Sequence, residues 1–313
     1  MDTYMHLRAW GPEAEAALAE LSAMLQRLDG QLSVTDPGSE IWAVNHAGGA
    51  PTALSGDAFT LLSRTLDFCA GTHGALDVTL YPVSRAWGFT TGDYRVPDPE
   101  ELARLLPLVD CSAVTLDADA RTVTLPPGAE LDLGAAAKGY AGALAAELLA
   151  RRGVRAAMLD LGSSTICLTG RKPDGSDWRI AVQDPEDPAA YAGVIACGPG
   201  SICTSGGYER YFIAEDGAVC WHILDPSTGR PAKAGLLSVT VLCPDALTGD
   251  LLSTALFVMG PERAADWWRA HGGFECILID ENRNILVTEG AADRFTPMGA
   301  YTHAELTVIG REE

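Results

Sequence analysis

The residues best suited to chemistry occur in four short segments of the chain. In the first, Asp77 and Thr79 place a carboxylate and a hydroxyl two residues apart in a stretch interrupted by Gly and Pro. Along extended backbone, side chains at this spacing point to the same side, so the pair could hold a polar ligand ring. A turn capped by Asp77 explains the same spacing. The residues alone leave both interpretations open.

The second segment starts at Asp132 and leads into an expected helix. Residues 134–137 read G-A-A-A, and such small residues let a backbone approach a ligand closely. The first N–H groups of a helix and its positive dipole end attract anions, and Lys138 adds a mobile charge. The segment could therefore hold a pyrophosphate. An alanine-rich helix start with an exposed lysine is the alternative.

The third segment spans residues 204–229 and contains His222, three residues before an Asp225-Pro turn. Imidazole titrates near neutrality, so this histidine could act as a general acid or base. A histidine that is only packed or solvated at a strand end is the alternative.

The fourth segment contains Asp250 and Thr254. Residues four apart share a helix face, so both side chains would offer hard oxygen ligands of the kind that Mg²⁺ prefers. The alternative is that Asp250 merely caps the helix.

Composition excludes several other functions. A net charge of −20 and a pI near 4.6 oppose nucleic-acid binding, which depends on clustered Lys and Arg. The nucleotide-binding and hydrolase motifs G-x-x-x-x-G-K-[ST], G-x-G-x-x-G, G-x-S-x-G and H-E-x-x-H are absent. Eight cysteines contain no C-x-x-C pair and mostly have apolar neighbours, so we expect buried free thiols.

Hydrophobic periodicity predicts an α+β fold. Strands occur in runs as well as in alternation with helices, which favours mixed or antiparallel sheets with flanking helices over a regular parallel sheet. Without an internal repeat or a linker, we expect one compact domain over residues 1–313 that could have two lobes. Helices are expected at 12–28 (closed by Gly30), 58–69, 250–259 and 261–271; a further helix should begin at 98, and another should follow the second segment and end at 152. A hairpin is expected at 115–125. Strands are expected at 156–161, 178–182, 194–197, 221–224, 238–242, 276–280 and 285–287.

Together the four segments resemble the ApbE family of FAD:protein FMN transferases. Family members carry G-A-F-D-P-T-x-x-P…W-G-F, D-L-G-G-I-A-K-G-Y-A, T-S-G-x-x-x-R-Y followed by H-I-I-D-P-x-T-G, and D-A-L-A-T-A-L-F-V-M-G. These correspond here to residues 74–89, 132–141, 204–229 and 250–260. A fifth element, L-S-x-Y-x-P-x-S-E-[IL]…N, corresponds to 32–45. Five motifs in order are more specific than any one of them.

The resemblance implies an ApbE-like, T-fold-like domain. It implies an enzyme that splits FAD at its pyrophosphate with Mg²⁺, attaches FMN to a Ser or Thr hydroxyl of an acceptor flavoprotein, and releases AMP. Carried over position by position, FAD would contact Ala75, Leu76, Asp77, Thr79, Thr35, Lys138, Leu144 and Ile223. Mg²⁺ would bind Asp250, Ser253, Thr254 and the backbone carbonyl of Ala141. His222 would be the catalytic base, and Asp225 would orient the site.

This sequence departs from the family pattern at three places. Thr35 stands where the family has a tyrosine that packs against the nucleotide, Ala143 replaces an Asp, and residues 162–164 read G-S-S instead of G-G-[ND]. A changed nucleotide wall keeps open a pyrophosphatase that gives FMN and AMP. A non-catalytic FAD-binding protein is a second alternative, which retention of His222 and Asp250 disfavours.

Family members are commonly exported lipoproteins. Residues 1–10 show no basic flank with an apolar run, and no stretch is apolar for the roughly 18–20 residues that span a bilayer. We expect an extracytoplasmic protein, periplasmic or membrane-anchored, whose leader has been removed. A membrane would then be contacted only through a removed lipid anchor. A cytoplasmic location is the alternative.

Overall fold

The computed structural model describes residues 3–311, which divide into two compact units. Unit 1 comprises residues 23–137 and 210–232. Unit 2 comprises the described residues up to 22, residues 138–209, and those from 233 onward. The expected single domain over 1–313 stays a prediction, and its positions 1, 2, 312 and 313 lie outside the described residues.

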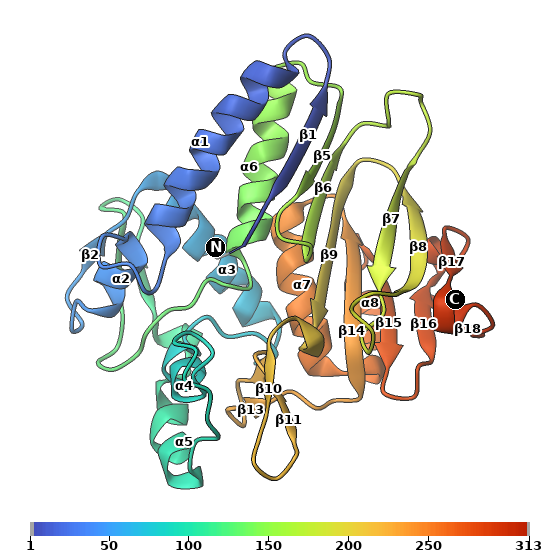
Figure 1. The fold of residues 1–313 in the computed structure, drawn as a ribbon. Coiled ribbons are helices and arrows are strands. Elements are labelled where there is room, and N and C mark those ends of the chain that lie inside the picture. Colours follow the sequence, from blue (N-terminus) through green and yellow to red (C-terminus); the bar gives the residue numbers. More distant parts are fainter. Residues whose placement is uncertain (1–2, 312–313) are drawn as a thin grey trace. The chain divides into compact units, whose positions relative to one another are not determined.

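Unit 2 is built on a large, mostly antiparallel sheet (Figure 1). In spatial order its strands are β1 (His6–Trp10), β5 (Ala156–Asp160), β6 (Thr165–Thr169), β9 (Gly200–Gly206), β14 (Leu236–Cys243), β15 (Glu275–Asp280), β16 (Ile285–Thr288) and β18 (Leu306–Ile309). Only the last pair is parallel. A smaller sheet follows the order β17 (Phe295–Pro297), β8 (Tyr191–Cys197), β7 (Trp178–Gln183).

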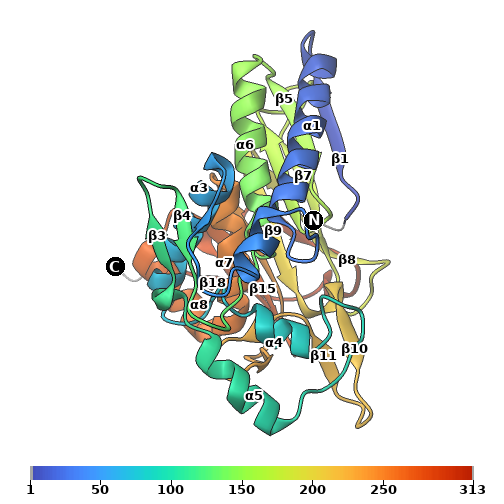
Figure 2. The same ribbon diagram turned by 90° about the vertical axis from the view of Figure 1, so that its left-hand side faces the viewer.

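The two faces of the large sheet are covered differently. On one face α7 (Ala246–Met259) packs against β9 and β14, and α6 (Ala137–Arg151) lies beside α7 (Figures 1 and 2). On the other face the small sheet covers the large one, and their apolar side chains form a common core that includes Ile202, Leu242 and Ile180. The remaining helices of unit 2 are α8 (Pro261–His271) and α9 (Glu289–Ala292).

Glycines let α6 approach α7 closely. A Cβ at Gly139 would lie 2.5 Å from the Ala246 carbonyl oxygen and 2.6 Å from the Asp250 Cβ. Any side chain at this position would therefore push the two helices apart. The segment that the sequence suggests as a ligand loop is thus, in part, a helix contact.

Unit 1 has short helices and three small sheets. Its helices are α2 (Glu40–Asn45), α3 (Gly56–Gly71), α4 (Tyr81–Ala86) and α5 (Pro99–Leu105), and α1 (Ala14–Leu32) runs across the division between the units. The sheets are β2 (Thr52–Ala53) with β4 (Thr122–Thr124) and β3 (Thr115–Asp117), β10 (Tyr211–Ile213) with β11 (Val219–Trp221), and β12 (Leu224–Asp225) with β13 (Arg230–Pro231). A hydrophobic core of this unit contains Trp87, Phe89 and Leu224.

The structure confirms the α+β class with mixed sheets, the 115–125 hairpin and the 261–271 helix. Three details are wrong. Gly30 does not close α1, which continues to Leu32, and the strand expected at 221–224 is interrupted because β11 ends at Trp221 and β12 starts at Leu224. The helix expected at 250–259 starts at Ala246, because Asp245 caps it by accepting the Thr248 N–H at 2.9 Å.

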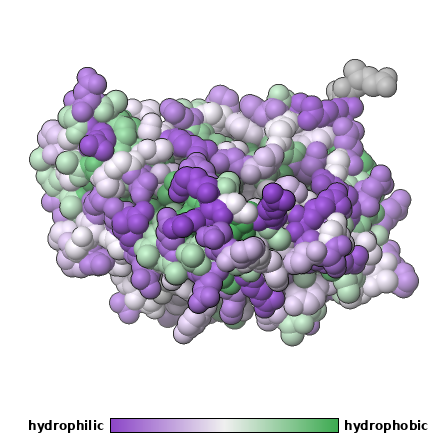
Figure 3. Space-filling view, turned by 90° about the horizontal axis from the view of Figure 1, so that it is seen from above, coloured by the Kyte–Doolittle hydropathy of each residue, from purple (hydrophilic) through white to green (hydrophobic). Residues whose placement is uncertain are grey.

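The thiols and the surface agree with the composition. All eight cysteines are unbonded and seven are buried, which confirms buried free thiols. On the face drawn in Figure 3, hydrophilic side chains are interspersed with neutral and hydrophobic ones. Among residues 3–311 no helix combines the length and apolarity that crossing a bilayer requires. The extracytoplasmic location stays a prediction.

Candidate functional site

Asp250 is a buried carboxylate in unit 2 that holds two other elements. It is only 5% exposed. Its Oδ2 accepts the Gly139 N–H of α6 at 2.7 Å, and its Oδ1 accepts the Thr165 hydroxyl of β6 at 3.0 Å. Since Asp245 is the helix cap, the capping interpretation of Asp250 is wrong. Asp250 is an interior group fixed by one amide and one hydroxyl.

Charge near Asp250 is balanced by Lys138. Burial raises the pKa of the Asp250 carboxyl, while the Lys138 ammonium, the Gly139 amide and the Thr165 hydroxyl lower it. The pKa of Glu209 is also raised by burial and lowered by Lys138. One lysine therefore faces two acidic groups within unit 2. Such a lysine can stabilise a buried carboxylate as well as an added anion.

Thr254 lies one helical turn after Asp250, as the spacing predicts. Its Oγ1 is 3.2 Å from the Ser205 Oγ, which is also 2.8 Å from the Ser253 Oγ. The Ser253 hydroxyl, fully buried, donates to the Asp250 carbonyl at 2.9 Å. The end of β9 and one turn of α7 thus share a cluster of three hydroxyls.

These oxygens fit a magnesium ion. An ionised carboxylate offers about four acceptor positions, and the two hydrogen bonds to Asp250 use only two of them. Mg²⁺ prefers hard oxygens and commonly combines one or two carboxylates with waters and substrate phosphates. Within residues 3–311 no cluster of three or more His, Cys, Asp or Glu could hold a metal. A site here would therefore depend on Asp250, on hydroxyl and carbonyl oxygens, and on the substrate.

The other predicted residues of unit 2 lie on α6. Lys138 is half-buried near the start of the helix, Ala141 is fully buried one turn later, and Leu144 is half-buried another turn on. Spacing of three residues places them along one side of the helix. Their FAD and metal contacts stay predictions.

In unit 1, Asp77 and Thr79 form a clamp on a neighbouring loop. Asp77 Oδ1 accepts both the Thr79 N–H at 2.8 Å and the Thr79 hydroxyl at 2.5 Å, and Asp77 Oδ2 accepts the Cys111 N–H at 2.9 Å. Thr79 Oγ1 in turn accepts the Asp110 N–H at 2.8 Å. Both side chains are therefore engaged in holding the turn, as the capping interpretation expects. A contact of Asp77 or Thr79 with FAD stays a prediction.

The remaining nucleotide residues of unit 1 differ in exposure. Ala75 and Leu76 are buried, at 2% and 6% exposure, whereas Thr35 is exposed in the loop before α2. Thr35 Oγ1 lies 3.3 Å from the Ser33 Oγ. A small hydroxyl on an exposed loop offers no aromatic face to a nucleotide.

His222 is held in one tautomer. Its Nδ1 lies 3.1 Å from the Arg210 carbonyl oxygen, which also accepts the His222 backbone N–H at 3.0 Å. A carbonyl only accepts, so Nδ1 carries the proton and Nε2 of the neutral ring is the basic nitrogen. The Phe89 ring meets the imidazole edge-on at 6.4 Å. In this tautomer, Nε2 is the ring nitrogen that has the lone pair of a general base.

Asp225 organises the turn that follows His222. Its Oδ1 accepts the Ser227 N–H at 2.8 Å and the Ser227 hydroxyl at 2.7 Å. The turn ends at Gly229, whose carbonyl accepts the Trp87 indole N–H at 2.7 Å. Ile223 is buried, and its carbonyl accepts the Ala232 N–H at 2.9 Å. The orienting partner of His222 seen here is the Arg210 carbonyl, and a catalytic role for Asp225 stays a prediction.

Comparison with known proteins decides the family. The model of the ApbE family matches residues 1–278. The chain belongs to the ApbE family. Proteins named FAD:protein FMN transferase are 32% identical over 287 residues in Klebsiella pneumoniae (strain 342), covering 91% of this chain and 88% of that protein. In Treponema pallidum (strain Nichols) one is 32% identical over 306 residues, covering 92% and 83%.

Solved ApbE structures have the same fold. The ApbE protein from Thermotoga maritima matches with a TM-score of 0.83 at 29% identity, over 91% of this chain and 92% of that one. The flavin transferase ApbE from Vibrio cholerae matches with a TM-score of 0.79 at 28% identity, over 96% and 95%. The resemblance seen in the sequence is confirmed, and so is the interpretation as an enzyme of flavin transfer.

One departure from the ApbE motif should lower the stability of the folded protein, because it places a side chain on left-handed backbone. Ser163 stands at the second glycine of the family's G-G-[ND] turn and has a φ of 64°. Glycine adopts this left-handed conformation without the Cβ clash. We expect Ser163→Gly to raise the free energy of unfolding by about 0.5–1 kcal/mol in denaturant titrations. Ser163→Ala keeps the clash and should bring no gain. Equal stability of both variants would contradict the strain.

Sequence reasoning missed four groups that position the predicted ones: the Gly139 amide, Thr165, Ser205 and the Arg210 carbonyl. Gly139, Ser205 and Arg210 belong to ApbE motifs in the sequence, but their residue types do not predict that they position other residues. Thr165 lies just after the G-S-S turn and belongs to none of these motifs.

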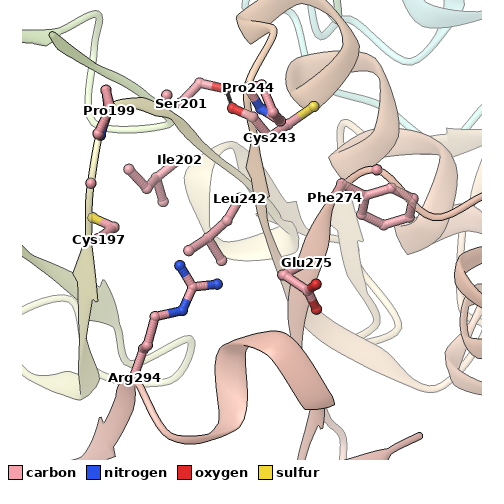
Figure 4. A pocket seen from close by; sticks show the side chains of 13 residues that line it. Cys197, Pro199, Ser201, Ile202, Leu242, Cys243, Pro244, Phe274, Glu275 and Arg294 are labelled. Carbon is pink, nitrogen blue, oxygen red and sulfur yellow. Dashed lines mark hydrogen bonds between the residues drawn. The ribbon is translucent and has the colours of Figure 1, made fainter. Parts of the chain in front are cut away.

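A pocket of about 260 Å³ lies elsewhere in unit 2 (Figure 4). Ser201, Leu242, Glu275 and Arg294 are among its lining residues, and none of the predicted site residues lines it. It adjoins the start of β9, whereas Ser205 is near the end of that strand. The pocket is therefore distinct from the oxygen cluster on α7.

Proposed function

We propose that this ApbE-family enzyme transfers FMN from FAD to a Ser or Thr hydroxyl of an acceptor flavoprotein, in a Mg²⁺-dependent reaction that releases AMP. One observation carries the proposal: the buried Asp250 carboxylate and the Thr254 hydroxyl, with Lys138 beside them, are an oxygen face and a cation of the kind that a metal–pyrophosphate substrate needs. The transferases from Klebsiella and Treponema support the chemistry through their names.

The chain's own residues supply the protein part of the chemistry. Asp250 and Thr254 would hold the metal, which when bound supplies neutralisation of pyrophosphate charge. Lys138 attracts the same anion. His222 Nε2 takes the proton of the acceptor hydroxyl, whose oxygen forms a bond to the FMN phosphorus. The bond from that phosphorus to the bridging oxygen breaks, and AMP leaves with that oxygen.

Binding of the two flavin nucleotides tests the ligand. We expect FAD to bind more tightly than FMN in fluorescence titrations, because only FAD carries the pyrophosphate that Lys138 attracts. Lys138→Ala should weaken FAD binding about tenfold and FMN binding much less. Arg151→Ala removes an equal charge from the far end of α6, where the side chain is 66% exposed, and should change neither affinity. Equal affinities of the native enzyme for FAD and FMN would refute the pyrophosphate assignment.

Hydrolysis of FAD is the reaction that would compete with transfer, and Thr35 is the residue that favours it. With a small hydroxyl in place of the family tyrosine, water could enter and attack FAD, giving free FMN and AMP. The products distinguish the two reactions, since only the transferase leaves flavin on an acceptor.

A further inference from the structure

Strand β9 presents alternate side chains to helix α7. Successive residues of a strand point to opposite faces, so Ser201, Cys203 and Ser205 share one face. The Ser201 hydroxyl donates to the Cys243 carbonyl at 2.8 Å, just before α7, and the Cys203 thiol to the Ala246 carbonyl at 3.7 Å. Ser205 completes the row against Ser253 and Thr254 of the same helix. Ser205 is thus the end of a polar seam between strand and helix.

Proton counting fixes the direction of the hydroxyl chain. A hydroxyl has one proton and can donate one hydrogen bond. The Ser253 hydroxyl donates its bond to the Asp250 carbonyl, which can only accept. In the 2.8 Å contact between Ser205 and Ser253, the donor must therefore be Ser205. The proton of Ser205 is then used, so Thr254 must be the donor in its 3.2 Å contact with Ser205.

The direction of the chain determines what Thr254 can offer. With its proton turned toward Ser205, the lone pairs of the Thr254 oxygen face away from the chain. The Ser253 oxygen already accepts from Ser205, donates to Asp250 and is fully buried. Of the two neighbouring hydroxyls, Thr254 is therefore the better oxygen ligand for a cation.

We propose that Ser205 is a positioning residue that orients the Thr254 hydroxyl for Mg²⁺ by accepting a hydrogen bond from it. The proposal rests on the proposed function, because it takes the metal to bind at Asp250 and Thr254. A cation on a hydroxyl oxygen makes its proton more acidic and strengthens the bond that this proton donates. The chain ends on the backbone of Asp250, so the three hydroxyls link one expected ligand to the other.

Substitution of Ser205 tests this role through metal affinity. In Ser205→Ala, Thr254 loses its acceptor and its proton can turn toward the cation. We expect the Kd for Mg²⁺, measured by isothermal titration with FAD present, to rise about tenfold while FAD affinity stays within twofold. The loss of rate should be recovered at saturating Mg²⁺. Ser205→Thr keeps the hydroxyl and should restore near-native Mg²⁺ affinity.

Thr204→Val is the matched control. Thr204 is the next residue of β9, and its hydroxyl pairs with Thr240 at 3.0 Å on the opposite face of the sheet. Its loss should leave Mg²⁺ affinity unchanged. Native Mg²⁺ affinity in Ser205→Ala, or an equal loss in Thr204→Val, would overturn the role of Ser205. Absence of Mg²⁺ binding by the native enzyme with FAD would instead overturn the metal of the proposed function, and the role of Ser205 with it.

Discussion

Asp250→Asn is expected to lower Mg²⁺-dependent AMP release from FAD by at least about 10³-fold. Asn has nearly the same shape, but its amide nitrogen cannot accept from Gly139 or Thr165 and its oxygen carries no full charge. The metal would lose the carboxylate on which the site depends, and loss of electrostatic stabilisation at a transition state is costly. Product formation followed by chromatography at several Mg²⁺ concentrations measures the effect.

Asp245→Asn provides the control on the same helix. Asp245 caps α7 by accepting the N–H and the hydroxyl of Thr248, at 2.9 and 2.6 Å. Asn is also a good helix cap, so this variant should stay folded and active. Near-native turnover by Asp250→Asn would show that Asp250 only ties α6 and β6 to α7.

His222→Ala is expected to lower flavin transfer by about 10²–10⁴-fold while FAD affinity changes little. The Nδ1–H donates a hydrogen bond to the Arg210 carbonyl, so the substitution would remove Nε2, the basic nitrogen of the ring. A general base acts mainly in the transition state, so binding and turnover should separate. Parallel measurements of FAD affinity and transfer rate check this separation.

A second histidine sharpens that test. His46 has a similar setting, with Nδ1 bonded to the Trp42 carbonyl at 2.8 Å and its ring stacked on Trp42, and His46→Ala should retain activity. Parallel loss of FAD binding and transfer in His222→Ala would make His222 a ligand or structural residue.

Motifs in the sequence identified the family, but local pattern misjudged the elements that carry the oxygen cluster. The sequence pattern predicts that this helix begins at Asp250, yet α7 begins at Ala246 and passes through Gly249. A Cβ there would lie 3.1 Å from both the Cys203 Sγ and the Ser201 Oγ. A side chain at position 249 would crowd the contact between helix and strand, a tertiary constraint that helix propensity does not contain.

Strand β9 was missed for the same reason. Its sequence, G-S-I-C-T-S-G, has few of the bulky residues that predict strands. The small side chains are needed because α7 packs on them. His222 shows the converse: its type suggested a base, but the carbonyl that fixes its tautomer belongs to Arg210, twelve residues earlier. A backbone partner that is many residues away along the chain cannot be predicted from residue types.

Mass analysis of a reaction containing the enzyme, FAD, Mg²⁺ and a set of Ser- and Thr-containing acceptor peptides tests directly whether this enzyme transfers FMN to a hydroxyl. We predict a peptide that carries FMN on a hydroxyl, AMP in equal molar amount, and neither product when Mg²⁺ is removed by chelation. Free FMN and AMP without modified peptide would contradict FMN transfer in favour of a pyrophosphatase, and unchanged FAD would show a protein that only binds the nucleotide.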